Sequence, residues 1–393
     1  MPIDLARARA ETRGCATVAH LNHAGASLMP APVADAVVDW LREEETTGGY
    51  ETARRHHDRL ENFYDASARL LNCHRDEVAF VENATRAWDM AFYALDLGPG
   101  DRILTAECEY GSNMIAYLHR ARRDGCEVAV VPSDAHGQLD VAALEGMIDD
   151  RTKLISISHI PTGGGLVNPA EAVGAVARRH GIPYLLDACQ SVGQMPVDVE
   201  RIGCDFLSAT GRKYLRGPRG TGLLYVRKDW IEGRDIDPPL LDQHAATLLS
   251  ETEYRMRADA RRFENWECYF AGKAALGRAI DYALEWGLEA IRERVTALAD
   301  GLRAELAAIP GVTVTDLGVE RCGIVTFTKD GEKPVDIRDR CIAKGINISA
   351  SSGSGSRVGF DRRGLESVVR ASVHYLNSEA EIERFVEEIR RGG

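Results

Sequence analysis

The central part of the chain alternates short apolar runs with longer amphipathic stretches. Seven runs predict buried strands: Val78–Val81, Arg102–Thr105, Glu127–Val131, Lys153–Ser158, Pro183–Leu186, Asp205–Ser208 and Gly222–Val226. The stretches Arg86–Leu95, Ser112–Arg123, Val141–Ile148 and Pro169–His180 between them predict helices. Buried strands separated by helices of this length are typical of a mainly parallel sheet covered on both faces. We therefore predict an α/β architecture whose ligands bind at the carboxyl ends of the strands.

The two ends of the chain follow different patterns. Long helices are predicted for Ala31–Glu45 and Thr52–Leu71, and two helices joined near Trp286-Gly287 are predicted within residues 270–308. Further along, the strands predicted are Gly311–Asp316, Cys322–Thr328 and Val368–Val373, and Glu379–Arg391 predicts a closing helix. No repeat or Pro/Ser-rich linker divides the chain. We predict a large domain over residues 20–265 and a smaller α+β domain over residues 266–393, with residues 1–19 as candidates for packing on the smaller one.

Composition narrows the functional class. The 393 residues include 60 acidic and 48 basic side chains, a formal net charge of -12, with no basic block of the kind that nucleic-acid binding needs. No run of about 18 apolar residues is present, and the first residues lack the apolar stretch of a signal peptide. The nine cysteines form no Cys-x-x-Cys pair. This composition predicts a cytoplasmic enzyme with reduced thiols and with neither a nucleic-acid nor a membrane partner.

A lysine at a strand end is the first candidate for chemistry. Lys213 closes the run Thr210-Gly211-Arg212-Lys213, which is followed closely by three glycines. The neighbouring Arg212 cation favours the deprotonated amine, which is the form a nucleophile needs. A solvated basic turn explains the same residues equally well when the run is taken alone.

An aspartate one strand earlier changes that balance. Asp187 ends the apolar run of the segment YLLDACQ, where its carboxylate points toward the ligand crevice of the sheet. By itself it would more often be a helix cap or a turn residue. Together, however, the pair matches the needs of pyridoxal phosphate, because an aspartate keeps the ring nitrogen protonated while a lysine holds the aldehyde as a Schiff base.

At this point the sequence resembles the class V aminotransferases, fold-type I pyridoxal-phosphate enzymes that include cysteine desulfurases, C–S lyases and isopenicillin N epimerase-like enzymes. The resemblance runs from Leu21 to the C-terminal helix and implies a mostly parallel seven-stranded sheet. Asp187-Ala188-Cys189-Gln190 is similar to the family's Asp-x-x-Gln, which implies Asp187 on the ring nitrogen and Gln190 near the phenolic oxygen. Thr210–Lys213 is similar to its Ser/Thr-Gly-His/Arg-Lys, which implies Lys213 as the Schiff-base lysine and Thr210 and Arg212 as phosphate ligands.

Three further segments fit the resemblance. Free backbone amides at a helix start can hold a phosphate, and the family uses this turn for that purpose, so the resemblance implies Ala84 and Thr85 as ligands. Without the resemblance, Asn83 is simply a helix cap. Tyr110 stands at the position of the aromatic residue that stacks on the ring, usually His in desulfurases, and it titrates far from neutrality. Thr162 is implied to lie near the ring oxygen.

The resemblance also implies substrate-binding residues. Asn22 and His23 stand in the loop LNHAGAS, which lines the substrate pocket in the family and is otherwise only a turn. Arg370 is implied to hold the α-carboxylate of an amino acid, a role that suits the planar guanidinium group. A buried arginine in an apolar strand also needs an anionic partner, which favours the same role independently.

Three departures from the family pattern limit the function. Desulfurases carry a persulfide-forming cysteine shortly before that arginine, and the matching segment Ile348–Asp361 has none. Trp266 and Glu267 replace the Gly-Thr that reaches the phosphate of a partner subunit. Gly163-Gly164-Gly165 makes the loop beside the ring unusually free, which is compatible with a bulky substrate or has no bearing on the substrate.

We therefore predict a pyridoxal-phosphate-dependent enzyme that acts on an L-amino acid, with Lys213 taking the Cα proton. The resemblance alone implies that it is a homodimer. Because the persulfide cysteine is missing, β-elimination from a cysteine-derived substrate, as in a C–S lyase, is the preferred reaction. Epimerisation or transamination is the alternative, and a persulfide-forming desulfurase or a non-catalytic relative is less favoured. No metal is expected, since the histidines and cysteines show no ligand spacing.

Overall fold

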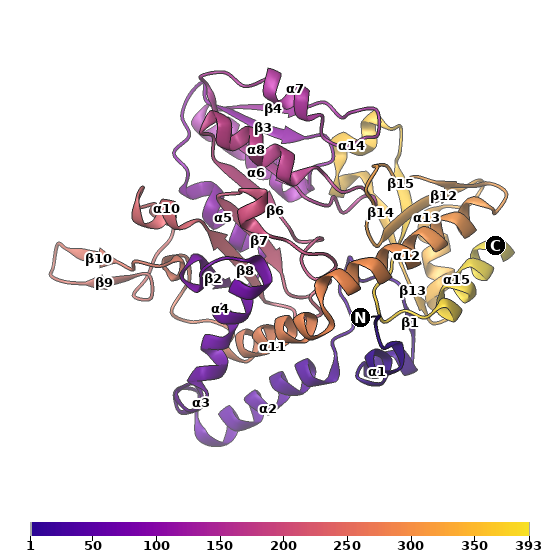
Figure 1. The fold of residues 1–393 in the computed structure, drawn as a ribbon, viewed down its shortest axis with the longest axis horizontal. Helices are drawn as coiled ribbons and strands as arrows, with labels where there is room; N and C mark the ends of the chain where they lie inside the picture. The colour runs from indigo at the N-terminus through magenta and orange to yellow at the C-terminus, as the bar shows by residue number, and fades with distance from the viewer. Residues whose placement is uncertain (1, 393) are drawn as a thin grey trace.

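A computed structural model describes residues 2–392, apart from the Ser354 side chain. Its centre is a seven-stranded sheet in the order β2-β8-β7-β6-β5-β3-β4 (Figure 1). The strands are β2 (Val78–Val81), β3 (Arg102–Ala106), β4 (Glu127–Val131), β5 (Thr152–Ser158), β6 (Tyr184–Asp187), β7 (Phe206–Thr210) and β8 (Gly222–Val226). Five neighbouring strands run parallel, while β8 pairs antiparallel with both β7 and β2. The predicted α/β fold with a mainly parallel seven-stranded sheet is confirmed.

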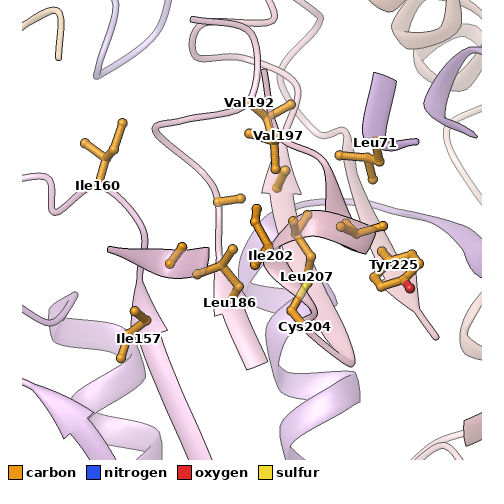
Figure 2. Packing of buried hydrophobic residues seen from close by; sticks show 14 of the residues in the cluster. Leu71, Ile157, Ile160, Leu186, Val192, Val197, Ile202, Cys204, Leu207 and Tyr225 are labelled. Carbon is orange, nitrogen blue, oxygen red and sulfur yellow. The ribbon is translucent and has the colours of Figure 1, made fainter. Parts of the chain in front are cut away.

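The sheet is buried on both faces, which explains its continuous apolar strands. Successive residues of one strand point to opposite faces, so Leu186 joins one core cluster and Leu185 the other. Figure 2 shows Leu186 and Leu207 within the first cluster. Helices α4 (His57–Leu71), α8 (Ala170–His180) and α11 (Phe270–Trp286) contribute to the first cluster, and α5 (Ala84–Ala94) and α6 (Gly111–Asp124) contribute to the second. Burying each large aliphatic side chain contributes roughly 1.5–3 kcal/mol.

A second, antiparallel sheet of four strands lies in the C-terminal part of the chain (orange to yellow in Figure 1). Its order is β11 (Val312–Val314), β12 (Ile324–Lys329), β15 (Ser367–Ser372) and β14 (Ser349–Ser352). Helices α12 (Leu288–Ala307), α13 (Pro334–Ala343) and α15 (Glu379–Arg391) pack on it. The N-terminal segment joins the same core through Ala8, Ala19 and Leu21. A smaller α+β unit is therefore present.

The packing of helix α11 indicates where the large domain and the smaller α+β unit meet. It packs on α4 and on α2 (Ala31–Thr47), and its Leu276 and Ile280 belong to the core of the large sheet. Helix α12 belongs to the core of the small sheet instead, and Gly287 with φ 82° separates the two helices. The division between residues 20–265 and 266–393 stays a prediction, with the packing of α11 favouring a boundary near Gly287.

Several elements differ from the prediction. The helix expected over Thr52–Leu71 is interrupted at His56, between α3 (Gly49–Arg55) and α4. Strand β14 has the sequence SASS, which carries no hydrophobic signal. The sequence prediction also omitted helix α13, whose apolar face is narrow, and a hairpin of β9 (Ala246–Leu248) and β10 (Tyr254–Met256).

The described chain was also searched for membrane spans and metal clusters. No helix within residues 2–392 is both long and apolar enough to cross a membrane. The same residues hold no group of three or more His, Cys, Asp or Glu side chains arranged to bind a metal ion. The nine cysteines are all free thiols. The cytoplasmic location stays a prediction.

One buried ion pair joins elements on both sides of the strand β2. The carboxylate of Glu264 accepts hydrogen bonds from the Tyr64 hydroxyl at 2.8 Å and from the Phe80 N–H at 2.8 Å. The ammonium group of Lys273 lies 3.4 Å from the same carboxylate. Burial alone would raise the pKa of Glu264, but Lys273, His244 and these hydrogen bonds lower it to about 2.

This ion pair predicts a specific loss of stability in acid. The folded-state pKa of Glu264 lies below its ordinary value of 4.5, so its contribution is present above that value and disappears as the pH falls to about 2. We expect Glu264→Gln to lower the free energy of unfolding by about 3–5 kcal/mol at pH 7, because Lys273 loses its counter-ion. Urea unfolding at a series of pH values should show this difference shrinking below pH 4.5, whereas Glu305→Gln, on the exposed side of α12, should change little. A difference that stays constant down to pH 2 would contradict the role of the ionised carboxylate.

Candidate active site

A cavity of about 290 Å³ opens at the carboxyl ends of the parallel strands, where the fold places ligands. All nine residues predicted to bind the cofactor line it: Ala84, Thr85, Tyr110, Thr162, Asp187, Gln190, Thr210, Arg212 and Lys213. They come from the ends of β2, β3, β5, β6 and β7 and the segments that follow these strands. The parallel sheet therefore collects residues that are more than 100 positions apart in the sequence.

One end of the cavity is suited to an anion. Asn83 caps helix α5 by accepting a hydrogen bond from the Arg86 N–H at 2.9 Å, and the N–H groups of Ala84 and Thr85 begin the helix without an intrahelical acceptor. Arg212 adds a cation at this end, and one of its guanidinium nitrogens lies 3.4 Å from the Thr210 hydroxyl. Helix N-termini with free amides bind phosphate groups, so this end can hold the phosphate of a cofactor.

Gly222 lets β8 approach this helix start closely. A Cβ atom placed on Gly222 would lie 2.9 Å from the Asn83 carbonyl carbon and 3.1 Å from the Ala84 nitrogen. It would also lie 2.8 Å from the Ala209 carbonyl oxygen. All three neighbours are backbone atoms that cannot swing away, so only glycine fits without moving the start of α5.

Asp187 and Lys213 line the same cavity. The Asp187 side chain is 8% exposed, and its two oxygens accept hydrogen bonds from the Cys189 N–H at 2.9 Å and the Asn113 amide at 3.1 Å. The amine of Lys213 has no hydrogen-bond acceptor among residues 2–392. Burial lowers the pKa of Lys213, and the nearby Arg212 and Arg370 cations lower it further, while Cys189 and Asp187 oppose them. Burial is thus the first cause, ahead of the Arg212 effect expected from the sequence.

Arg370 and Asn22 do not themselves line the cavity; Arg370 contacts Thr162, which does. The Arg370 guanidinium is 7% exposed and donates to the Thr162 hydroxyl at 2.6 Å and the Thr162 carbonyl at 3.1 Å. Its second terminal nitrogen lies 3.4 Å from the Asn22 amide oxygen, and its Nε–H has no partner. Within the described chain no carboxylate contacts this cation. Arg370 and Asn22 are therefore placed to receive an anionic ligand.

The Thr162 hydroxyl is oriented by its neighbours. It accepts hydrogen bonds from Arg370 and from the Gln190 amide nitrogen, the latter at 3.2 Å. A hydroxyl has one proton and two lone pairs, so these two bonds use its acceptor capacity and leave its proton to donate elsewhere. Since Thr162 lines the cavity, that proton is available to an oxygen of a bound ligand.

His23 does not line this cavity, in contrast to the expectation from its loop. Its ring is fully buried, packs edge-on against His20 and His374, and contacts the Ser27 hydroxyl at 2.9 Å. Burial and the neighbouring histidines lower the pKa of His23 well below its ordinary value, so the ring is neutral. The turn at this loop directs His23 into the protein interior and leaves Asn22 beside Arg370. A direct role of His23 in substrate binding stays a prediction without geometric support.

The sequence analysis missed several residues that line the cavity. Asn113 lies one helical turn after Tyr110, and Ser158 is the last residue of β5. Trp88 lies on α5, and Arg219 stands between two glycines of the loop before β8. Strand-end position is a signal that could have found Ser158, whereas nothing in the sequence marks Trp88 or Arg219 as facing a ligand.

The segment without the family cysteine is docked against the large domain. Phe360 on α14 (Arg357–Arg362) is 2% exposed, and a Cβ atom on Gly163 would lie 2.7 Å from its ring. Arg362 forms an ion pair with Glu107, on the loop that leads to Tyr110. The free space at Gly163 is thus filled by a side chain of the protein itself.

Comparisons with known proteins identify relatives of this chain. Residues 19–385 match the family model described as aminotransferase class-V. A probable cysteine desulfurase of Methanothermobacter thermautotrophicus is 29% identical over 371 residues, which cover 93% of this chain and 92% of the relative. The solved apo structure of a cysteine desulfurase from Thermococcus onnurineus NA1 has a TM-score of 0.91 at 24% identity and covers 100% of this chain and 98% of its own.

A third relative is the cystine C–S lyase C-DES. Its complex with the reaction product cysteine persulfide has a TM-score of 0.87 at 23% identity, covering 96% of this chain and 99% of its own. In another structure of C-DES, a mutant with a TM-score of 0.88, glycine is covalently linked to the pyridoxal-phosphate cofactor. These solved structures establish the shared fold.

The residues at the cavity fit pyridoxal phosphate. At one end of the cavity, Arg212 and the free amides at the start of α5 are placed to bind the phosphate. The missing side chain of Gly222 leaves room for that helix start. Asp187 and Lys213 line the same cavity and provide a carboxylate and an amine. Arg370 has an unpaired Nε–H, and Gln190 has an amide oxygen without a partner, as expected where a polar ligand completes the set.

We expect Gly222→Ala to weaken cofactor binding, because the added methyl group pushes the start of α5 out of position. The Kd for pyridoxal phosphate, measured by the absorbance change on titrating apoprotein, should rise at least about tenfold, which corresponds to about 1.4 kcal/mol. Gly146→Ala at the end of α7 (Val141–Gly146) is the matched control, since an added Cβ there meets nothing within 4 Å. An unchanged Kd in a folded Gly222→Ala protein would argue against phosphate binding at this helix.

Proposed function

This chain belongs to the aminotransferase class-V family, and we propose that it is a pyridoxal-phosphate-dependent lyase that eliminates a sulfur substituent from a cysteine-derived L-amino acid. The observation that carries the choice of reaction is the state of the thiols around the site. Relatives named cysteine desulfurase and the C–S lyase C-DES support cysteine chemistry in general. Desulfuration through an enzyme-bound persulfide would need one of this chain's own cysteines as the sulfur acceptor.

The described cavity contains one thiol and no activated thiolate. Cys189 is the only cysteine that lines it, and burial raises the pKa of Cys189, with the Asp187 carboxylate adding to the effect. Cys108, beside the docked α14, also has its pKa raised by burial. A thiolate is the form that attacks sulfur, so neither group is suited to form a persulfide. This supports elimination ahead of desulfuration through an enzyme-bound persulfide.

The side chains at the cavity divide the work of elimination. Arg370, with Asn22 beside it, binds the α-carboxylate of the substrate, and its unpaired Nε–H adds a donor to the planar guanidinium. Thr162 accepts hydrogen bonds from Arg370 and Gln190, and its own hydroxyl proton would be donated to the ring oxygen of the bound cofactor. Asp187, whose two oxygens accept hydrogen bonds from Cys189 and Asn113, would hold a proton at the ring nitrogen of the bound cofactor.

Proton transfer falls to Lys213. When bound, pyridoxal phosphate supplies an electron sink for the electron pair released at the substrate Cα. The lowered pKa of Lys213 increases the fraction of free amine, which takes the Cα proton onto Nζ. The Cβ–S bond then breaks with both electrons going to sulfur, and a thiol or persulfide leaves. Hydrolysis of the remaining three-carbon unit gives pyruvate and ammonia.

We also propose that the protein is a homodimer. Leu248, Leu249 and Tyr254 are exposed on the β9–β10 hairpin, which projects from the body of the protein (Figure 1). Trp266 is 55% exposed nearby in the sequence. Exposed apolar side chains concentrated on one projecting element are typical of an interface.

The reaction is tested by its products. We expect purified holoenzyme with cystine or S-substituted cysteines to release pyruvate and ammonia, and Lys213→Ala to release neither and to lose the visible absorbance of lysine-bound cofactor. Cys189→Ser and Cys108→Ser should retain pyruvate formation within about threefold, because neither thiol takes part. Alanine as the main product, lost in Cys189→Ser, would instead support persulfide formation. A racemised amino acid or a keto acid without sulfur release would support the alternatives of epimerisation or transamination.

Arg370→Lys should separate substrate binding from chemistry. Lysine keeps the charge but loses the paired donors and the contact to Thr162, so we expect KM for the amino acid to rise about 10- to 100-fold with a smaller change in kcat. Steady-state kinetics with one substrate series checks this. The Kd for pyridoxal phosphate should remain within about threefold of the wild-type value, and a large rise in that constant would place Arg370 in cofactor binding.

A further inference from the structure

A second carboxylate, Glu109, lies buried directly behind Asp187. The Glu109 side chain is 3% exposed, between the end of β3 and the start of α6. One of its oxygens accepts hydrogen bonds from the Tyr110 N–H at 2.6 Å and the Ser158 hydroxyl at 2.5 Å. The other accepts from the Ser158 N–H at 3.0 Å and the Thr105 hydroxyl at 3.2 Å. Four hydrogen-bond donors from three segments of the chain therefore contact this one carboxylate.

A fifth donor links Glu109 to the cavity. The Asn113 amide nitrogen lies 3.0 Å from Glu109 and 3.1 Å from the Asp187 oxygen Oδ2. An amide nitrogen carries two hydrogens, so one Asn113 side chain can donate to both carboxylates at once. The amide oxygen would be repelled by either carboxylate, which fixes the orientation of Asn113. Glu109 and Asp187 are therefore joined through a single, oriented amide.

No cation neutralises Glu109 within residues 2–392. Its hydrogen-bond partners are neutral, and the titratable groups that face it are Asp187, Tyr117, Tyr184 and Cys108. Burial raises the pKa of Glu109 to about 7, against the hydrogen bonds from Ser158, Tyr110 and Asn113 that favour the ionised form. A buried carboxylate held only by neutral donors is costly, so a positive charge nearby would relieve it.

We propose that Glu109 is a positioning residue of the cofactor site: it orients Asn113 to donate to Asp187, and its negative charge favours the protonated ring nitrogen of the bound cofactor. The protonated ring of the bound cofactor would thus supply the positive charge that no described residue provides for Glu109. This inference rests on the proposed binding of pyridoxal phosphate and does not depend on which reaction the enzyme performs.

Removing the charge without changing the shape tests the proposal in the absence of substrate. In holoenzyme of Glu109→Gln, the pH midpoint at which the visible absorbance of lysine-bound cofactor changes should fall by about 1 unit, because the protonated forms lose a nearby anion. The Kd for pyridoxal phosphate should rise about 10- to 100-fold. Glu107→Gln is the matched control two residues away, since Glu107 pairs with Arg362 and Ser133 and does not contact Asn113.

Two further experiments separate the effect of the Glu109 charge from the effect of its side-chain shape. Glu109→Asp keeps the charge, so its midpoint should stay within about 0.3 units of the wild type even if Kd rises. A cofactor analogue with carbon in place of the ring nitrogen should bind wild type and Glu109→Gln with equal Kd, because nothing remains there to protonate. If Glu109 had only a structural role, Glu109→Gln would weaken the binding of pyridoxal phosphate and of the analogue equally.

Several results would overturn the proposal. It fails if Glu109→Gln has the wild-type midpoint and Kd, if Glu107→Gln shifts the midpoint equally, or if the analogue shows the full difference. If Glu109→Gln does not fold, Asn113→Leu decides, since it removes the bridging amide at similar volume and should raise Kd at least about tenfold; an unchanged Kd contradicts the proposal. A wild-type protein that develops no visible band with pyridoxal phosphate would instead refute the proposed function.

Discussion

The buried guanidinium of Arg370 is the constraint on which the site depends, because the fold encloses a cation that no carboxylate among residues 2–392 neutralises. Its terminal nitrogens contact only the neutral oxygens of Thr162 and Asn22, and its Nε–H has no partner. A cation buried in this way costs several kcal/mol unless an anion binds. Binding of a carboxylate-bearing ligand recovers that cost. The unneutralised positive charge of Arg370 on β15 therefore favours the binding of an anionic substrate.

The sheet topology explains why the other charged groups meet this arginine. Asp187 ends β6 and Lys213 follows the end of β7, and these two strands are hydrogen-bonded neighbours in the large sheet. Reversal of the strand direction at β8 brings Gly222 against the start of α5 and leaves free N–H groups beside Arg212. The N-terminal residue Asn22 bridges to Ser372 at the end of β15 and so joins the small unit to the cavity. Each group is set by the end of an element, which gives it little freedom to move.

Much of this arrangement could be predicted from the sequence, for identifiable physical reasons. Strands buried on both faces are continuous apolar runs, and the motifs around Asp187 and Lys213 stand at the ends of two of them, so both the sheet and the residues that line the cavity could be inferred. Strand β14 (SASS) and the break at His56 could not, since pairing with β15 and helix packing determine them rather than local pattern. His23 has the right position in the sequence, but its ring packs among other histidines. Glu109 lies only four residues before Asn113, but it is the fold that brings this pair to Asp187, 74 residues after Asn113.

The same physical reasoning explains how the segment around α14 affects the site. Phe360 fills the space beside Gly163, and Arg362 holds Glu107, so the segment is tied to both loops that flank the cavity. Glu107 and Glu109 belong to one short loop, and the first faces the docked segment while the second faces Asp187. Packing of α14 therefore fixes the loop that carries Tyr110 and the Glu109 carboxylate. A segment docked by an aromatic ring and an ion pair is ill suited to carry a thiol in and out of the cavity, which is consistent with elimination that needs no enzyme thiol.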